Sequence, residues 1–274
     1  MVFMELNCFW IMSMDNNEKI DMADVTVLIP VRIDSIIRLE NLIAVIDYLL
    51  SNFNISIVVT EASKHNNHVL EKVLPSSINY HFVQDMDPVF YRTKYINKMA
   101  SDVCTPYLGV WDSDVIFPPR QVVDAAEALR SKNFDVVFPY DGTFLDTGTI
   151  IRQMYVESGD MLVLSELRDL MSLPYGNEMR GGAFMVNTER YKAAGMENLN
   201  FYGWGPEDWE RIERWKALGY RLKNITGNLY HLSHPRDING RHNSDAQRRV
   251  SVFQKDITCF SSATEIKQRL NLDI

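Results

Sequence analysis

The stretch Tyr107-Leu-Gly-Val-Trp-Asp-Ser-Asp-Val-Ile-Phe-Pro118 decides the predicted fold. A short hydrophobic run bounded by turn signals is typical of a buried β-strand, and Asp112 and Asp114 stand at or just past its carboxyl end. Open α/β sheets bind their ligands at this edge. Two acids beside buried chain are costly unless a cation or hydrogen bonds compensate them, and Mg²⁺ and Mn²⁺ take carboxylate and phosphate oxygens. The stretch therefore indicates a site for a metal ion and a nucleotide diphosphate, with a solvated acidic turn as the plainer alternative.

The chain before this strand alternates strands and helices. Apolar, β-branched runs predict three strands, at residues 25–30, 55–60 and 78–83. Apolar side chains at a 3.6-residue spacing predict a helix over residues 39–50, capped by Asp34 or Ser35, and a short helix is expected over residues 66–74. This alternation predicts βαβ units, so we expect an α/β fold with a Rossmann-like, mostly parallel central sheet flanked by helices in a single domain.

A helix predicted to start near residue 90 carries two cations in its first turn, Arg92 and Lys94. Lys94 and Asn97 lie three residues apart and can share a face. Cations at a helix start oppose the helix dipole, and a nearby diphosphate would explain why they are tolerated. A solvated basic face is the equal alternative from these residues alone.

The totals exclude several classes of function. A chain of 274 residues with 46% hydrophobic residues can bury a substantial core, and its formal charge of −8 argues against generic binding to nucleic acid or to an anionic membrane. The three cysteines, Cys8, Cys104 and Cys259, are scattered and match neither a disulfide framework nor a thiolate metal site. We therefore expect a reducing compartment.

Residues 1–22 are predicted to form an amino-terminal extension. Residues 1–14 are apolar but interrupted by Glu5 and Asn7, too short to span a bilayer, and without the basic start of a signal peptide. The extension either touches a membrane or precedes a later true start. We expect a cytoplasmic protein with at most peripheral contact at the inner face of the membrane.

The middle of the chain continues the pattern and then interrupts it. A helix is predicted after Pro118 and a strand at residues 135–139, whereas residues 140–180 are predicted to be an insertion over one edge of the site, with a helical stretch near residues 161–173. Such segments often carry acceptor selectivity. Gly181 and Gly182 then enter an apolar strand, where they allow close approach of the backbone to a ligand or to another strand.

The next helix is predicted to begin at Pro206, a residue suited to the first helical position, and to end before Gly219. Trp209, Ile212 and Trp215, three residues apart, are predicted to form its buried face.

This helix brings acids and an indole together. Glu207 and Asp208 occupy the first turn, where the helix dipole stabilises a carboxylate, although acids are common in any first turn. The indole of Trp204 is a suitable platform for the C–H face of a sugar, and a nearby carboxylate can accept a hydroxyl proton. Further on, residues 228–236 are predicted to be a strand that leaves the core. Its His231 and His234 are candidate metal ligands that would complete a site containing aspartate, with a structural role as the even alternative. Residues 241–274 are predicted to be a helical tail.

Taken in order, these pieces resemble the β-1,4-galactosyltransferase group of GT-A fold glycosyltransferases, with bacterial enzymes of the chondroitin-polymerase type as a close comparison. The matching pieces are Ile29-Pro-Val-Arg32, Phe90-x-Arg-x-Lys-x-x-Asn97, Asp112-Ser-Asp114, Gly181-Gly182, Tyr202-Gly-Trp-Gly-Pro-Glu-Asp208 and His234. Each piece is weak alone, whereas the ordered set is specific and extends over most of the chain.

The resemblance implies roles for these residues. Asp114 would bind Mn²⁺ (with Mg²⁺ as the alternative ion), His234 would complete the metal sphere, and Asp112 would face the ribose or the metal shell. Asp208 would be the catalytic base, and Glu207 would position sugar hydroxyls. The donor- and nucleotide-binding set is expected to be Arg32, Glu61, Arg92, Lys94, Asp112, Gly182 and Trp204.

Two departures from the family pattern affect these roles. The family's Gly-Gly-Glu-Asp-Asp-Asp stands here as Gly-Pro-Glu-Asp-Trp-Glu, so the acid after the base is absent. His231 occupies the place of a methionine ligand in the galactosyltransferases, so His231, His234 or both are metal-ligand candidates. The insertion at residues 140–180 is also longer than the corresponding segment of the animal enzymes, so the identity of the acceptor cannot be transferred from them.

The expected function is inverting, metal-dependent transfer of a hexose or N-acetylhexosamine, with galactose or N-acetylgalactosamine preferred. The donor would be a UDP-sugar and the acceptor a saccharide or lipid-linked saccharide, in surface polysaccharide or glycan synthesis. The alternatives are a module that binds nucleotide-sugar or glycan without turnover, and a metal-dependent phosphohydrolase that uses Asp112 and Asp114. Neither alternative explains the segment from Gly203 to Asp208.

Overall fold

A seven-stranded sheet forms the centre of the protein, in a computed structural model that describes residues 18–176, 178–235 and 238–272. The strand order is β3-β2-β1-β4-β8-β6-β9. The strands are β1 (Ile20–Val31), β2 (Phe53–Ser63), β3 (Asn79–Gln84), β4 (Tyr107–Trp111), β6 (Val136–Phe138), β8 (Ala183–Asn187) and β9 (Leu222–Asn224). Strand β8 is antiparallel to both neighbours, and the other adjacent pairs are parallel. The predicted α/β fold with a mostly parallel sheet is confirmed.

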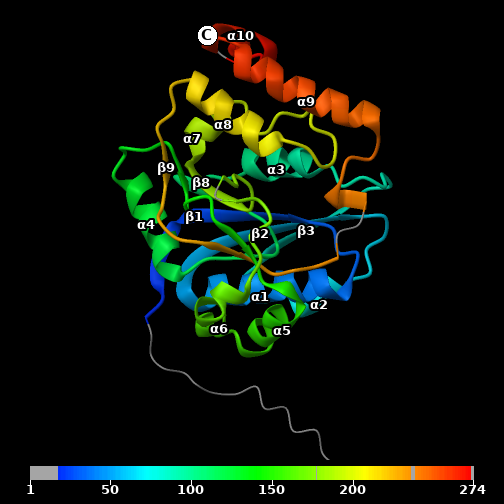
Figure 1. Cartoon of the computed structure of the whole chain (residues 1–274), viewed down its shortest axis with the longest axis vertical. Coiled ribbons are helices and arrows are strands. Elements are labelled where there is room, and N and C mark those ends of the chain that lie inside the picture. Colours follow the sequence, from blue (N-terminus) through cyan, green and yellow to red (C-terminus); the bar gives the residue numbers. More distant parts are fainter. Residues whose placement is uncertain (1–17, 177, 236–237, 273–274) are drawn as a thin grey trace, which may run out of the picture.

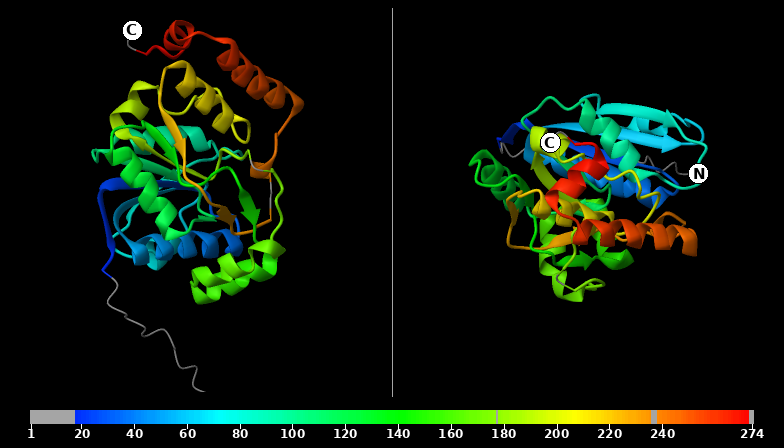
Figure 2. Two further views of the ribbon diagram at one scale, coloured as in Figure 1. Left: turned by 60° about the vertical axis from the view of Figure 1, so that its left-hand side comes forward. Right: turned by 90° about the horizontal axis from the view of Figure 1, so that it is seen from above.

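Helices cover both faces of this sheet (Figures 1 and 2). Helices α1 and α5 lie on one side of it, whereas α3 and α8 lie on the other, with α9 and α10 stacked outside α8. The helices and 3-10 turns are α1 (Ile36–Asn52), α2 (Val69–Val73), α3 (Arg92–Ser101), α4 (Pro119–Arg130), α5 (Gly148–Ser158), α6 (Met161–Glu166), η1 (Arg168–Leu170), α7 (Thr188–Ala193), α8 (Glu207–Ala217), η2 (Ile238–Gly240), α9 (Asp245–Phe260) and α10 (Ala263–Leu270). No described helix has both the length and the apolar character that a membrane span requires.

The first strand and helix show how the sequence sets this architecture. Residues 27–31 of β1 are all buried because the strand lies between two parallel neighbours with helices on its faces. The chain then turns into α1, where the side-chain oxygen of Ser35 accepts a hydrogen bond from the N–H of Arg38 at 3.4 Å. Of the two predicted caps, Ser35 is therefore the one that the structure uses.

A second, three-stranded sheet was not predicted. It consists of β5 (Val115–Ile116), β10 (Leu229–His231) and β7 (Phe144–Asp146), in the order β5-β10-β7. Each strand has only two or three residues, too few for a period-two pattern to be visible in the sequence. This small sheet positions the candidate site.

The predicted division of the chain into segments stays a prediction. Strand β1 begins at Ile20, inside the predicted extension at residues 1–22, and residues 1–17, which include Cys8, lie outside the described residues. Residues 140–180 contain β7, α5 and α6, and the tail after residue 241 contains α9 and α10. Cys104 and Cys259 are both free and exposed.

Helix α8 corrects one prediction. Ile212 and Trp215 are buried as predicted, but Trp209 is 40% exposed. A spacing of three residues falls short of a helical turn, so Trp209 and Trp215 point about 120° apart. The buried positions are taken instead by Arg211 and Arg214, at 1% and 0% exposure. Pro206 is the N-cap residue rather than the first helical residue, and Gly219, with φ +77°, follows the helix as predicted.

Arg214 ties α8 to the segments around it. Its guanidinium pairs with Glu210 at 3.2 Å and donates to the backbone carbonyls of Ala194 and Met196. Glu210 in turn accepts a hydrogen bond from the Thr258 hydroxyl of α9 at 3.0 Å. The packing of α9 on α8 therefore depends on a satisfied buried ion pair.

We predict that Arg214→Met lowers the free energy of unfolding by about 3–5 kcal/mol, because the buried Glu210 loses its counter-charge. Urea denaturation measures this change. Lys216→Met is the control on the same helix: Lys216 is 58% exposed and pairs with Glu213, so its loss should cost less than about 1 kcal/mol. Similar losses in the two variants would contradict the buried-pair account.

Candidate functional site

The small sheet brings Asp114 beside the two late histidines. His231 of β10 pairs with Val115 of β5, and the N–H of Leu232 donates to the carbonyl oxygen of Asp114 at 2.7 Å. The Asp114 carboxylate then lies 3.0 Å from Nε2 of His234 and 3.9 Å from Nε2 of His231. One ligand atom from each of the three side chains lies within 4.8 Å of the others, so this cluster is the candidate metal centre.

The other ring nitrogen of each histidine, Nδ1, makes a hydrogen bond on the side away from Asp114. Nδ1 of His231 lies 2.7 Å from Asp146, its cross-strand partner on β7, and Ser233 donates its hydroxyl to the same carboxylate oxygen at 2.7 Å. Nδ1 of His234 lies 2.8 Å from the carbonyl oxygen of Pro235. Because these partners accept the Nδ1 proton, both Nε2 atoms are directed to Asp114 as potential ligands.

The titration behaviour of the cluster reflects this proximity. Burial alone would raise the pKa of Asp114, but His231 and His234 hold it well below its ordinary value. Conversely, burial would lower the pKa of His234, and Asp114 raises it above the ordinary value. A carboxylate and two imidazoles suit Mn²⁺ or another divalent cation, whose charge would replace this mutual compensation.

Asp112 has a different partner. Its carboxylate accepts hydrogen bonds from Nε and Nη2 of Arg92 at 3.1 and 2.5 Å, and its backbone N–H donates to Gly182 at 2.8 Å. Burial raises the pKa of Asp112, which Arg92 opposes, and both Asp114 and Asp208 add to the rise. The charge of Asp112 therefore interacts both with Asp114 of the metal cluster and with Asp208 at the start of α8.

The start of α8 presents Glu207 and Asp208. Asp208 accepts a hydrogen bond from Nη2 of Arg211 at 2.5 Å, and Nη1 of Arg211 pairs with the buried Glu197 at 2.6 Å. Burial, assisted by the Asp208 charge, raises the pKa of Glu207 to about 8. Oε2 of Glu207 is buried without a hydrogen-bond partner, so it is a polar atom that a substrate hydroxyl could satisfy.

The paired glycines make room for this arrangement. A Cβ atom at Gly181 would lie 2.6 Å from Oδ2 of Asp208, so any larger residue would displace the carboxylate. Gly182 has φ +89°, and a Cβ there would lie 2.5 Å from the Leu229 side chain. The close approach predicted for these glycines is thus made to Asp208 and to β10.

The chain is similar to known proteins in part of its sequence and in its fold. Residues 169–235 match a family described as the N-terminal domain of galactosyltransferase. No curated protein matches the sequence. Among solved structures, a mannosyltransferase from Pyrobaculum calidifontis in complex with GDP-Man and Mn²⁺ is similar, at 17% identity and a TM-score of 0.54, over 90% of this chain and 68% of that chain. The chain has the GT-A glycosyltransferase fold.

A second similar structure is glucosyl-3-phosphoglycerate synthase from Mycobacterium tuberculosis, in complex with Mn²⁺, UDP and phosphoglyceric acid. It is 14% identical over 91% of this chain and 79% of that chain, with a TM-score of 0.48. The matched family covers Gly181, Asp208 and both histidines, and together with the GT-A fold it supports the resemblance to the galactosyltransferase-like group.

Two residues of the expected donor-binding set make internal bonds in this GT-A fold. Arg32 donates to the carbonyl oxygens of Ala62, Asp87 and Pro88 and to the Asp85 carboxylate, so it holds the loop after β3. Glu61 is 1% exposed and accepts a hydrogen bond from the Tyr80 hydroxyl at 2.7 Å. Their direct contact with a nucleotide stays a prediction.

The remaining two residues of the expected donor-binding set, Lys94 and Trp204, are accessible. Lys94 is exposed, with its ammonium 5.3 Å from the centre of the Tyr95 ring. Trp204 is 43% exposed and lies edge-on to His242. Both side chains can meet a ligand, and their roles also stay predictions.

Several residues of the site were missed by the sequence analysis. Asp146 ends the short apolar run of β7, the same signal that singled out Asp112, but it lies in the segment that was hardest to interpret. Arg38 acts electrostatically on both Asp114 and His234, and only its place one turn into α1 could have suggested this. Arg211, which was given no role from the sequence, is buried on α8.

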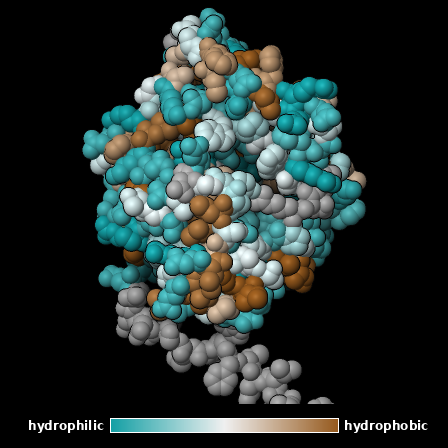
Figure 3. Space-filling view, viewed as in Figure 1, coloured by the Kyte–Doolittle hydropathy of each residue, from teal (hydrophilic) through white to brown (hydrophobic). Residues whose placement is uncertain are grey.

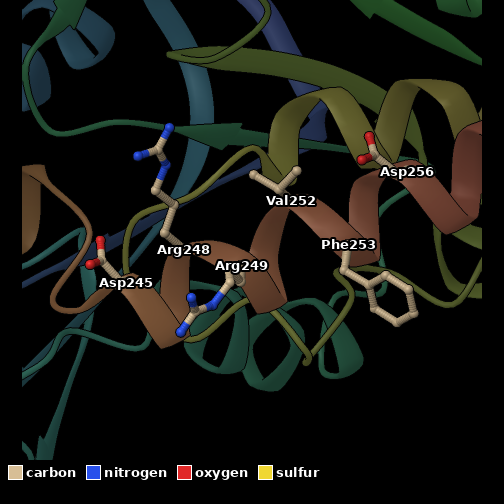
Figure 4. A pocket seen from close by; sticks show the side chains of 6 residues that line it. All are labelled: Asp245, Arg248, Arg249, Val252, Phe253 and Asp256. Carbon is tan, nitrogen blue, oxygen red and sulfur yellow. The ribbon is translucent and has the colours of Figure 1, made fainter.

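Two hollows on the surface of the described residues lie elsewhere. One, of about 460 Å³, is lined by six residues of α9, Asp245, Arg248, Arg249, Val252, Phe253 and Asp256 (Figure 4). The other, of about 560 Å³, lies over β1, β2 and β3 and includes His81. Neither contains a predicted site residue. In the face shown in Figure 3, hydrophilic residues predominate and apolar ones gather in small groups.

We predict that Asp146→Asn weakens Mn²⁺ binding by about 10- to 100-fold, because His231 loses the carboxylate that orients its ring. Isothermal titration calorimetry of the free protein measures this without any substrate. Asp124→Asn on α4, which removes an aspartate that pairs with Arg120, is the matched control. Equal affinity in the two variants would show that Asp146 does not support a metal ligand.

We also predict that Glu207→Gln stabilises the protein at alkaline pH. The folded pKa of about 8 exceeds the ordinary 4.5, so stability contributed by Glu207 falls as pH rises between these values. Removing the charge should recover on the order of 1 kcal/mol at pH 8 relative to pH 5. Urea denaturation at the two pH values tests this, with Glu213→Gln on the same helix as control; an unchanged pH dependence in Glu207→Gln would contradict the buried-acid account.

Proposed function

We propose that this protein is a metal-dependent, inverting glycosyltransferase that moves a hexose or N-acetylhexosamine from a UDP-sugar to a saccharide acceptor. The observation that carries the proposal is that Gly181 and Gly182 link the two groups of the site. The Asp112 N–H, two residues before the metal-ligand candidate Asp114, donates to the Gly182 carbonyl oxygen at 2.8 Å, and a Cβ at Gly181 would lie 2.6 Å from Oδ2 of Asp208. A cation site next to a candidate base is what transfer from a nucleotide-sugar requires.

The comparisons support the general class. The mannosyltransferase with the same fold binds GDP-Man and Mn²⁺, and the family match spans the candidate base and both candidate metal-ligand histidines. A preference for UDP with galactose or N-acetylgalactosamine rests on the resemblance to the galactosyltransferase group. A lipid-linked saccharide in surface polysaccharide synthesis is the proposed setting for the acceptor.

The residues at the metal cluster suit Mn²⁺, with Mg²⁺ as the alternative. Asp114, His231 and His234 would hold the ion, and both histidine rings are already oriented for it. When bound, the ion supplies charge stabilisation for the leaving diphosphate. Arg92 lies near Asp112 and the α8 acids and contributes a fixed positive charge to the same region.

Asp208 is proposed to accept the proton of the acceptor hydroxyl. Arg211 holds one of its oxygens, which fixes the direction of the carboxylate and leaves Oδ2 toward Gly181. With the base on one face of the sugar and the diphosphate leaving from the other, a single displacement inverts the anomeric carbon. Glu207, protonated near neutral pH, can donate a hydrogen bond to a sugar oxygen.

The two alternatives make different demands on these residues. A phosphohydrolase would act on simple phosphate esters and would not need Asp208 or Trp204. A binding module would bind UDP with Mn²⁺ but release none from a donor. The unpartnered Glu207 oxygen beside a second carboxylate favours transfer.

We predict that Asp208→Asn lowers UDP release by about 10²- to 10⁴-fold while Mn²⁺-dependent UDP binding persists, because only proton transfer is lost. The assay is a donor screen with Mn²⁺ across UDP-Gal, UDP-GalNAc, UDP-Glc, UDP-GlcNAc and GDP-Man. Asp114→Ala should lose both binding and release. Turnover that is unchanged in both folded variants would refute the proposed site.

A further inference from the structure

Arg180 differs from the other arginines around it. Every other arginine within residues 18–176 and 178–235 has a carboxylate oxygen within 4.0 Å, whereas Arg180 has none among the described residues. Its hydrogen bond is to the carbonyl oxygen of the preceding Met179, at 3.1 Å. The side chain is only half-exposed, so this charge is partly removed from water without an anion beside it.

The position of Arg180 places this charge at the proposed base. It directly precedes Gly181, the residue whose Cα packs against the Asp208 carboxylate. Its guanidinium carbon lies 5.8 Å from the centre of the Trp209 ring, on the residue after Asp208. Asp208 is not its counter-ion, because no carboxylate oxygen of Asp208 lies within 4.0 Å of Arg180; Oδ1 of Asp208 instead accepts from Arg211 at 2.5 Å.

The surroundings have the chemistry of a saccharide site. Trp209 and Trp204, which flank the Glu207–Asp208 pair in sequence, are 40% and 43% exposed, so both indoles offer surface on which a sugar ring can stack. Arginine pairs with carboxylate or phosphate through two parallel hydrogen bonds, a geometry that its planar fork favours. An anion bound here would give Arg180 the charged partner that it lacks among the described residues.

Resting on the proposed transferase function, we infer that Arg180 binds an anionic group, a carboxylate or a phosphate, carried by the acceptor saccharide. The donor diphosphate is the other anion that the reaction supplies, and it belongs beside the Asp114 cluster. Arg180 instead stands against the candidate base and Trp209, where the acceptor hydroxyl must lie. It also ends the 140–180 segment, which was expected to carry acceptor selectivity.

The test compares acceptors that differ in one charged group. With the best donor and Mn²⁺, UDP release is measured on p-nitrophenyl glycosides of glucose and glucuronic acid, of galactose and galacturonic acid, and on the 6-phosphates of the two neutral sugars. The uronides and the phosphates separate the two possible anions. We expect kcat/KM to be at least about tenfold higher for an anionic acceptor than for its neutral partner.

Arg180→Met should lower kcat/KM for the preferred anionic acceptor about 10- to 100-fold more than for its neutral partner. The preference of Arg180→Lys for the anionic acceptor should lie between those of the unaltered protein and Arg180→Met. Arg168→Met, in the same segment and 59% exposed, is the matched control and should leave the ratio unchanged. If the role of Arg180 were purely structural, Arg180→Met would lower kcat/KM equally for the anionic and the neutral acceptor of a pair.

The outcomes separate the two proposals. If Mn²⁺-dependent UDP binding and donor turnover are absent, the proposed function itself fails. If turnover occurs but no anionic glycoside is preferred, or none is used, the role of Arg180 in acceptor binding is wrong. If Arg180→Met raises the Kd of Mn²⁺–UDP and lowers kcat/KM equally for all acceptors, the partner of Arg180 is the donor diphosphate and the inference is overturned.

Discussion

The pairing of β10 between β5 and β7 is the constraint on which the candidate site depends. It joins residues 114, 146 and 231, which are remote in sequence, through strands of two or three residues. Backbone hydrogen bonds fix the register: Leu232 donates to Asp114 and Thr147 donates to His231. The side chain of Asn41 on α1 also donates to the Leu232 carbonyl at 2.7 Å. The histidines are thus oriented by the main chain before any ion binds, which reduces the ordering cost of metal binding.

Charge compensation is the second constraint, and the four acids of the site differ in the partners that compensate them. Asp112 has Arg92, Asp208 has Arg211, and Asp114 has the histidines, whereas Glu207 has no hydrogen-bond partner for one oxygen. Buried ion pairs contribute little net stability because desolvation offsets attraction, so their value here is positional. Arg211 is itself held by Glu197 and covers the Phe184 ring at 4.3 Å. The direction of Asp208 is therefore set from β8 and from the loop after α7.

The sequence predicts the large sheet well and, of the small sheet, only the strand within residues 228–236 that contains β10, for a physical reason. Runs such as residues 25–30 are long enough to show continuous burial between parallel neighbours, so β1, β2 and β4 were found. Strands β5 and β7, and the place of β10 between them, are specified by pairing with distant parts of the chain, which one sequence does not display. Arg211 and Arg214 were missed because a buried arginine is distinguishable from a solvated one only through its partners. The metal-cluster residues could be proposed from residue type, but their supporting partner Asp146 could not.

The sequence suggested that the 140–180 segment only covers the site, whereas the structure also packs it against α1. Arg152 of α5, 3% exposed, donates to Asn41 at 2.8 Å and to Glu40 at 2.7 Å, and Asn41 also holds the β10 loop. The segment contains Asp146 behind a candidate metal ligand and ends with Arg180 beside the candidate base. Since Arg152 anchors it to α1 between these two points, the candidate metal centre and the proposed acceptor contact share one packed segment. Selectivity built on such an element comes from fixed placement of groups rather than from closure of a loop.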